Sequence, residues 1–367
     1  MHIPDGYLSP STCAALYGAA LPFWYGAFAR VKRLLNTRLV PLLAVASAFC
    51  FVLMMFNIPL PGGTTGHAMG VGAATVVLGP WAAMLSLSIA LLIQALFFGD
   101  GGITTLGANC FNMAIVGSLV AYLVYRVVAG KALLTSSRRT MAAALAGYAA
   151  INASAFLTAC ELGIQPLFFK DATGAPLYAP YSLHIAIPAM MIGHFTFAGV
   201  AELLASGGVV AYLQRTNPAL LDYRASGQTN RDDDAALPSA SGSGWRLARP
   251  LWIRLALFML LTPLGIVAAG TAWGEWSASD FADQDKRQEI AAASGNVALP
   301  AEQPRGLQRL SSLWSAPFPQ YAPPFVHRPA FGYVMSAMFG SGLITGCFLL
   351  MGWVFVRREK AAAKGSP

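Results

Sequence analysis

The stretch LVPLLAVASAFCFVLMMFNIPLPGGTTGHAMGVGAATVVLGPWAAMLSLSIALLIQALFFG, residues 39–99, contains no Asp, Glu, Lys or Arg. A helix needs about 20 predominantly apolar residues to cross a bilayer, so this stretch is long enough for more than one crossing. The whole chain of 367 residues follows the same pattern, with 56% hydrophobic and 11% charged residues and a mean hydropathy of +0.55. Soluble domains carry about 25% charged residues. The sequence therefore predicts an all-α, polytopic membrane protein.

Further apolar segments on both sides of this stretch bring the number of expected helices to nine. We expect them at about 12–29, 39–60, 66–79, 80–98, 104–128, 140–160, 182–212, 251–270 and 331–356. The third is short and rich in Gly and Ala, which lets helix backbones approach closely, so it predicts a central helix packed inside the bundle. The first seven segments predict a seven-helix bundle within residues 1–214. The last two predict a unit of two C-terminal transmembrane helices within residues 250–367.

Two polar regions separate these segments. Residues 215–249 contain Asp232, Asp233 and Asp234 together with the Ser- and Gly-rich run SASGSG, a composition typical of a flexible linker. Residues 271–329 are polar and contain several prolines, and they connect the last two apolar segments. We expect the first region to be a cytoplasmic linker and the second to be an extracytoplasmic loop.

The loop charges predict the orientation in the membrane. If residues 66–79 count as a crossing, the segments directly followed by Lys and Arg are the first, fifth, seventh and ninth, all odd-numbered, and such loops lie in the cytoplasm by the positive-inside rule. We therefore expect the N-terminus outside and the C-terminus inside, in the inner (plasma) membrane. The same loops explain the net charge of +8. No basic stripe interleaved with aromatic residues occurs, so nucleic acid is not an expected partner.

Motifs of known enzyme classes are missing from the sequence. It contains no HExxH metalloprotease motif, no GxSxG nucleophile elbow and no P-loop. All five cysteines lie within apolar segments and lack CxxC spacing, which favours a role as small core residues. We predict no catalytic residues and no nucleotide hydrolysis by this chain, so the energy for any active transport must come from a partner.

The first two residues, Met1 and His2, carry nitrogen atoms that can chelate a metal ion. The α-amine of Met1, the backbone nitrogen of His2 and Nδ1 of the His2 ring close adjacent five- and six-membered rings on one metal ion. Tetragonal nitrogen sites favour Ni(II) or Cu(II), with Co(II) also possible. Because no positive n-region precedes the first apolar run, we expect no cleavable signal peptide and a retained Met1. The alternative, an incidental histidine near the terminus, stays open.

His67 is the candidate for the fourth donor. The expected topology brings it out on the same side of the membrane as Met1 and His2, in uncharged surroundings with small neighbours. A simple hydrogen bond from its imidazole to a carbonyl is the alternative.

Other ionisable residues are weaker candidates. We expect His184 and His194 to be buried and hydrogen-bonded, with an indirect role in a metal site left open. A functional role is one interpretation of Glu202. Solvation of its side chain at the cytoplasmic end of the segment is the favoured one. Asp100 and Glu161 are expected in loops at the outer face, where they attract cations, although turn chemistry also explains Asp100.

Three motifs carry a resemblance to a known family. MHIPDGYLSP (1–10), GGTTGHAMGVGAATVVLGPWAA (62–83) and FGDGGITTLGANCFNMA (98–114) resemble the CbiM/NikM family, the substrate-specific components of energy-coupling factor transporters for cobalt or nickel. The similarity covers about residues 1–215. It implies a seven-helix fold with the N-terminus inserted into the bundle. It also implies a metal ion, carried as substrate and not as a cofactor, on the terminal amine, the amide and ring nitrogens of His2, and His67.

The resemblance also implies partners, namely a transmembrane coupling protein and two cytoplasmic ATPases. Small residues of the first segment have the small-xxx-small spacing of a helix-docking surface, with ordinary packing as the alternative; they are Ala14, Ala15, Gly18 and Ala19. TPLGIVAAGTAWGEW (262–276), with the long loop and last helix, resembles a fused CbiN/NikN-type accessory unit. Whether that unit loads metal or only stabilises the assembly stays open.

The resemblance implies high-affinity binding and uptake of cobalt or nickel in an ATP-driven system, with a link to cobalamin biosynthesis. The alternative is a self-sufficient secondary transition-metal transporter, driven by an ion gradient, in which Glu202, His184 and His194 form a relay. The residues do not choose between cobalt and nickel.

Overall fold

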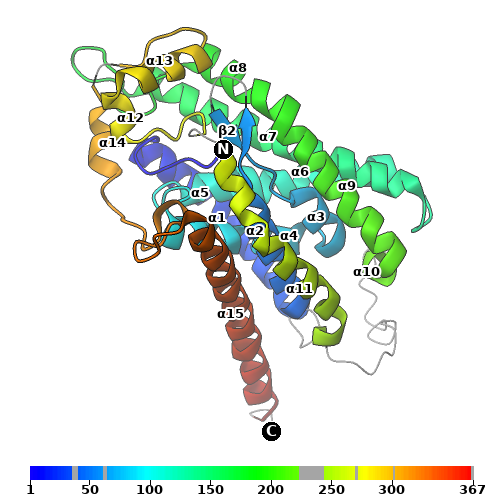
Figure 1. Cartoon of the computed structure of the whole chain (residues 1–367). Coiled ribbons are helices and arrows are strands. Elements are labelled where there is room, and N and C mark those ends of the chain that lie inside the picture. Colours follow the sequence, from blue (N-terminus) through cyan, green and yellow to red (C-terminus); the bar gives the residue numbers. More distant parts are fainter. Residues whose placement is uncertain (35–39, 61–63, 223–243, 269–271, 301, 365–367) are drawn as a thin grey trace.

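The computed structural model shows a helical protein (Figure 1). It describes residues 1–34, 40–60, 64–222, 244–268, 272–300 and 302–364. Helices occupy all nine expected segments. Their bounds are α1 Pro10–Leu34, α2 Val40–Met54, α3 Val71–Leu78, α4 Pro80–Ile93 with the π-helical turn η1 Gln94–Phe98, α5 Leu106–Asn109 with η2 Cys110–Val116 and α6 Gly117–Ala129, α7 Ser137–Phe168, α8 Leu183–Gly193 with η3 His194–Ala198 and α9 Gly199–Thr216, α11 Gly244–Leu260 with the 3₁₀ turn η5 Thr262–Val267, and α15 Pro329–Lys364. The short α10, Ala219–Asp222, follows α9.

Six helical segments of the described chain are long and apolar enough to cross a membrane. They cover Pro80–Phe98, Leu106–Ala129, Ser137–Phe168, Leu183–Thr216, Ala248–Val267 and Pro329–Val354. The apolar helix α2 is shorter, with 15 residues. The eight residues of α3 reach about 12 Å, less than the roughly 30 Å of a bilayer core. The expected polytopic membrane protein is confirmed, and the number of crossings by the short helices stays a prediction.

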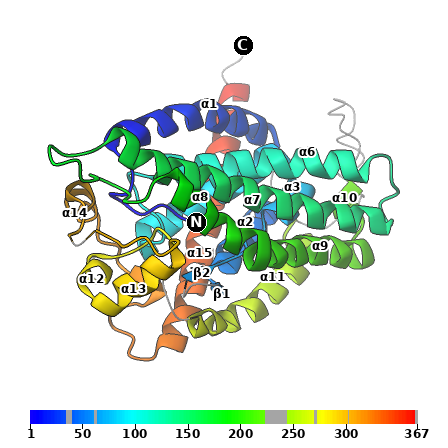
Figure 2. The same ribbon diagram turned by 90° about the horizontal axis from the view of Figure 1, so that it is seen from above.

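The short helix α3 is the centre of the bundle. All eight of its residues are buried, and it packs against α4, α6, α7 and α9, whereas α7 runs between α6 and α9 (Figure 2). Gly72 makes this approach possible, because a Cβ there would lie 2.5 Å from Oγ of Ser206 and 2.7 Å from Cα of Gly147. The expectation of a small-residue helix inside the bundle is confirmed.

A two-stranded hairpin precedes α3 and was not expected. Strands β1 (Ile58–Leu60) and β2 (Thr64–Gly66) pair antiparallel, with Ile58 opposite Gly66. The strand β2 ends directly before His67, so the hairpin fixes where the chain enters the centre of the bundle.

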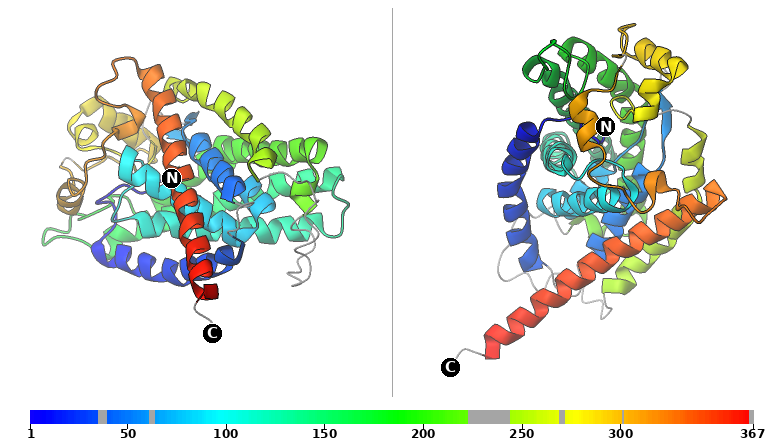
Figure 3. Two further views of the ribbon diagram at one scale, coloured as in Figure 1. Left: turned by 90° about the horizontal axis from the view of Figure 1, so that it is seen from below. Right: turned by 90° about the vertical axis from the view of Figure 1, so that its left-hand side faces the viewer.

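The C-terminal unit packs on the bundle through α2. Both α11 and α15 contact α2, and the distal end of α15 extends away from the N-terminus (Figure 3). The region between them contains α12 Ala278–Ala282, α13 Gln284–Ala293, α14 Arg305–Leu310 and the 3₁₀ turn η6 Pro319–Tyr321. This region lies near the N-terminus (Figure 1). Of the expected linker 215–249, residues 223–243 lie outside the described residues, and α9 and α11 extend into its two ends.

The cysteines behave as core residues. All five are free thiols; Cys13, Cys50 and Cys110 are buried, and Cys160 and Cys347 are partly buried. Their expected role as small packing residues is confirmed.

Candidate metal centre

The first residues of the chain are threaded into the interior. Met1 and His2 are each 2% exposed. The backbone N–H of Ile3 donates to Oδ1 of Asn109 at 2.8 Å, and the carbonyl of Ile3 accepts from the N–H of Gly102 at 2.9 Å. Both backbone groups of Ile3 are thus held by residues near α5, and the terminus has a fixed place in the bundle.

Asp5 also attaches the N-terminal segment to the residues before α5. Its carboxylate accepts from the N–H of Thr104 at 2.7 Å and from the N–H of Ile103 at 3.0 Å. Gly102 must be a glycine at this crossing, because a Cβ would lie 2.4 Å from the backbone nitrogen of Asp5. The motifs at residues 1–10 and 98–114 therefore form one interlocked structure.

The two candidate histidines meet in this interior. Nδ1 of His2 lies 3.3 Å from Nε2 of His67, and the ring centroids are 5.0 Å apart. Metal–nitrogen bonds of about 2 Å place neighbouring ligand atoms about 2.8 Å apart in a square, so a small movement would bring both nitrogens onto one ion. Nδ1 of His67 lies 3.1 Å from the carbonyl oxygen of Ala68. Because a carbonyl only accepts, Nδ1 carries the proton and Nε2 presents its lone pair toward His2.

Burial favours the neutral form of His67. Desolvation is the main cause that holds its pKa well below the usual value, and the neighbouring His2 ring and the terminal amine lower it further. A metal ligand must be deprotonated. The surroundings thus keep His67 in the form that binds a cation.

Asp100 makes a second polar contact with Nδ1 of the His2 ring. Its Oδ1 lies 2.9 Å from Nδ1 of His2, and its Oδ2 accepts from the hydroxyl of Tyr321 and from Nε2 of Gln94. Burial raises the pKa of Asp100, but the charge and the hydrogen bond of His2 outweigh it and hold the pKa well below the usual range. The carboxylate therefore stays ionised beside the candidate ligand, with a donor from the C-terminal unit.

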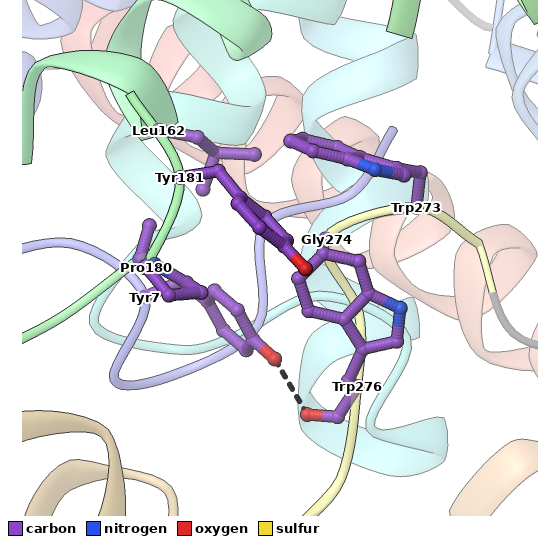
Figure 4. Close-up of a pocket in the computed structure, with 8 residues that line it drawn as sticks. Tyr7, Leu162, Pro180, Tyr181, Trp273, Gly274 and Trp276 are labelled. Carbon is purple, nitrogen blue, oxygen red and sulfur yellow. Dashed lines mark hydrogen bonds between the residues drawn. The ribbon is translucent and has the colours of Figure 1, made fainter. Parts of the chain in front are cut away.

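The terminal amine also faces the C-terminal unit. The nitrogen of Met1 donates to Oε1 of Glu275 at 3.2 Å. An aromatic cluster beside this pair joins the two parts of the chain: the hydroxyl of Tyr7 donates to the carbonyl of Trp276 at 2.6 Å, and the rings of Tyr181 and Trp273 pack against Trp276 (Figure 4). This packing places Glu275 next to the amine.

The donors gathered here are mainly nitrogens. Within the described residues, no three His, Cys, Asp or Glu side chains come together as a possible metal cage. The four predicted donors include a terminal amine and a backbone nitrogen, so only two of them are side chains. Nitrogen donors of this kind suit Ni(II), Cu(II) or Co(II), and Mg²⁺ and Ca²⁺ prefer oxygen.

Several weaker candidates differ from the expectation. His194 is buried as expected, with its Nδ1 at 2.8 Å from the carbonyl of Met190, whereas His184 is exposed beside Ser182, so its expected burial is wrong. The favoured interpretation of Glu202, that its side chain is solvated at the cytoplasmic end, is also wrong. Its side chain is 0% exposed because it faces the N-terminal end of α3. Glu161 is not in a loop, because α7 continues to Phe168.

Sequence reasoning missed Gln94, Asn109, Glu275 and Tyr321 and undervalued Asp100. One signal was available: Asp100 is the first charged residue after the charge-free stretch 39–99 and stands directly beyond a membrane-length segment. Glu275 and Tyr321 give no such signal, because their contacts with the terminus cross more than 200 residues of sequence.

Comparisons with known proteins identify relatives of this chain. Residues 2–220 match the family described as CbiM, cobalt uptake substrate-specific transmembrane region. The fused nickel transport protein NikMN of Rhodobacter capsulatus is 54% identical over 94% of this chain and 95% of its own length. The probable fused nickel transport protein LarMN of Lactiplantibacillus plantarum is 40% identical over 79% and 82%. A crystal structure of a truncated transition metal transporter is 51% identical with a TM-score of 0.55, over 59% of this chain and 99% of the other.

Proposed function

Because the chain belongs to the CbiM family of cobalt uptake substrate-specific transmembrane proteins, we propose that it is the substrate-binding subunit of an ATP-driven energy-coupling factor transporter. Its relatives are transport proteins and not enzymes. The observation that carries the proposal is the buried pair of His2 Nδ1 and His67 Nε2, 3.3 Å apart.

The proposed ligands are the amine of Met1, the backbone and Nδ1 nitrogens of His2, and Nε2 of His67. Binding replaces one proton each on the amine, on the amide and on Nδ1 of His2 by a divalent cation, since Nδ1 lies between the carboxylate of Asp100 and the lone pair of His67. Two carboxylates lie beside these ligands, Glu275 at the amine and Asp100 at the His2 ring. The pairing of each carboxylate with one end of the Met1–His2 chelate favours this assignment.

Nickel is the proposed cargo. A square arrangement of four nitrogens, one of them a deprotonated amide, suits Ni(II). The nickel transport protein of Rhodobacter capsulatus, 54% identical over nearly its full length, supports the same choice.

We place the site at the outer face of the plasma membrane. The charge distribution favours an external N-terminus and a cytoplasmic C-terminus. The region 272–329 contacts the N-terminal residues, as expected if both lie on one side. Metal would therefore be captured from outside and released inward.

The proposed partners are a transmembrane coupling protein and two cytoplasmic ATPases. The outer face of α1 supports the first: Ala14, Ala15 and Gly18 are exposed, and a Cβ on Gly18 would meet nothing within 4 Å. Small exposed residues at this spacing let another helix approach closely. The missing P-loop motif agrees with ATP hydrolysis on a separate chain.

Residues 250–367 are the proposed fused accessory unit. The two fused relatives, which this chain matches over most of their length, support it. The contacts of Glu275 and Tyr321 favour a role in enclosing the metal.

Vesicle transport tests the proposal. The purified chain is reconstituted alone and with its coupling protein and ATPases, and nickel uptake is measured with and without ATP. We expect uptake only in the complete assembly with ATP, and its loss in His67→Ala. Uptake by the chain alone, unaffected by ATP, would support the gradient-driven alternative. The placement of Glu202 against α3 and of His184 at the surface does not favour the relay which that alternative requires.

A further inference from the structure

Glu202 of α9 is a buried carboxylate aimed at the N-terminal end of α3. Its Oε2 accepts from the N–H groups of Met69 at 2.7 Å and Gly70 at 2.8 Å. Its Oε1 accepts from the N–H of Gly72 at 3.3 Å and from the hydroxyl of Ser206 at 2.8 Å. Both oxygens are therefore occupied, three times by backbone groups of one short segment.

That segment carries His67. On one side, Gly66 is fixed by its pairing with Ile58 in the hairpin. On the other side, Met69 and Gly70 are fixed by Glu202. Only His67 and Ala68 lie between these two attachments, and the His67 ring donates a hydrogen bond to the carbonyl of Ala68. The position of the His67 ring therefore depends on the attachment at Glu202.

The chemistry of the attachment requires a carboxylate. The first N–H groups of a helix have no partner within the helix, and a negative group near them is stabilised by the helix dipole. Hydrogen bonds to an ionised acceptor are about twice as strong as neutral ones. A glutamine would turn an NH₂ donor toward N–H donors and leave at least one buried donor unsatisfied.

We propose that Glu202 is a positioning residue for the metal site, which holds Nε2 of His67 within reach of His2 through the backbone of residues 69–72. This inference rests on the proposed function in taking His67 as a ligand. It connects α9 with the site through the backbone of residues 69–72, because Glu202 itself touches no proposed ligand atom.

A purely structural role for Glu202 makes a different prediction. If the carboxylate only caps α3, its loss lowers the stability of the fold and leaves the geometry of bound nickel unchanged. The positioning role alters how the ligand meets the metal. The absorption bands of the bound nickel ion and its dissociation rate report this geometry directly.

The test compares Glu202→Gln with Glu161→Gln in the full-length protein. Glu161 is a second buried carboxylate, bonded to Nδ2 of Asn112 at 2.8 Å, and it serves as the matched control. Nickel dissociation into a chelator, the visible spectrum of the nickel-loaded protein and the melting temperature of the metal-free protein are measured. We expect Glu202→Gln to weaken nickel binding about 10- to 100-fold, as for other groups that orient a metal ligand, and to shift the spectrum. Glu161→Gln should match the wild type in both.

Ser206→Ala is the second variant, in case Glu202→Gln does not fold. It removes one hydrogen bond from Oε1 of Glu202 and one from the N–H of Ala73, and we expect a smaller loss of the same kind. Wild-type spectrum and dissociation rate in the folded variants would overturn the inference, provided that His67→Ala abolishes binding. Unchanged binding in His67→Ala would overturn the proposed function together with it.

Discussion

Nδ1 of His2 lies 3.3 Å from Nε2 of His67, although the two residues are 65 positions apart in the sequence. The contact is made in the interior by a terminus held at Ile3 and Asp5 and by a loop held between the hairpin and Glu202. Each histidine is therefore positioned by backbone contacts of its own segment.

Replacing His2 by alanine should abolish high-affinity nickel binding. The change removes Nδ1 and with it the six-membered ring that the amide and the imidazole close on the metal ion, so the planar donor set is incomplete. Equilibrium binding and metal analysis of the purified protein measure the effect. An alanine inserted after Ala363 is the control and should have no effect. Unchanged stoichiometry and affinity in the first variant would contradict the ligand assignment.

Nickel affinity should fall as the pH is lowered from 8 to 5. His67 has a pKa held well below its usual value of about 6.5 by burial. Protons therefore compete with nickel for His67 only well below pH 6.5, so the fall in affinity should be steepest at the acid end. A titration that stays flat would indicate carboxylate or thioether ligands in place of nitrogens.

The lowered pKa of His67 also predicts that the stability of the metal-free protein depends on pH. Below about pH 6.5 the unfolded chain binds a proton on His67 that the folded state excludes, so stability falls as the pH falls. Melting temperatures at pH 7.5 and 5.5 measure this loss, which should be smaller in His67→Gln. An equal loss in that variant would contradict it.

Tyr321→Phe should weaken nickel binding, although the residue belongs to the C-terminal unit. The change removes the hydroxyl that holds Asp100 beside the His2 ring, and the loss of such a supporting hydrogen bond lowers metal affinity about 10- to 100-fold. Tyr333→Phe is the control, since this ring packs on Tyr321 at 5.6 Å. Equal affinities in isothermal titrations of the two variants would show that the hydroxyl of Tyr321 has no such role.

Single cysteines placed at Ser279 and Ser137 should test the orientation. Both serines are exposed, at opposite ends of the proposed topology. In a background without the native cysteines, a membrane-impermeant thiol reagent should label position 279 in intact cells and position 137 only after lysis. The reverse pattern would invert the proposed direction of capture.

Gly72→Ala should destabilise the bundle by about 1–3 kcal/mol through overpacking, because the new methyl group meets Ser206 and Gly147. Gly208→Ala on α9 is the control: its Cβ would meet nothing within 4 Å, and alanine is the better helix former by about 1 kcal/mol. Melting temperatures in one detergent should therefore move in opposite directions. A wild-type value for Gly72→Ala would show that α3 can shift to make room.

The helices were predictable from apolar run lengths, but their ends were not. The prediction ended the sixth helix at Cys160, whereas α7 continues to Phe168. Glu161 and Gln165 looked like the start of a polar loop. They remain helical and buried because Glu161 accepts from Asn112 and Gln165 donates to the carbonyl of Glu161 and accepts from the N–H of Ser9. Asn112 and Ser9 lie outside α7 and leave no trace in the sequence around Glu161 and Gln165.

Only part of the site was predictable for the same reason. Met1 and His2 are neighbours, so the chelate rings follow from covalent geometry, and loop charges placed His67 on their side. The contact between Asp100 and Tyr321 joins residues 221 positions apart. It requires α15 and the loop before it to dock on the bundle, which hydropathy alone does not determine.

The location of Glu275 and Tyr321 on the same polypeptide as His2 has a consequence for stoichiometry and assembly rate. A separate accessory subunit would have to find each bundle by diffusion within the membrane, at whatever density the cell supplies. Covalent joining replaces that encounter by an intramolecular one, for which effective concentrations reach the millimolar range with short linkers. Every copy of the proposed binding site is thus made with one copy of the C-terminal unit that contacts it, whatever the level of expression.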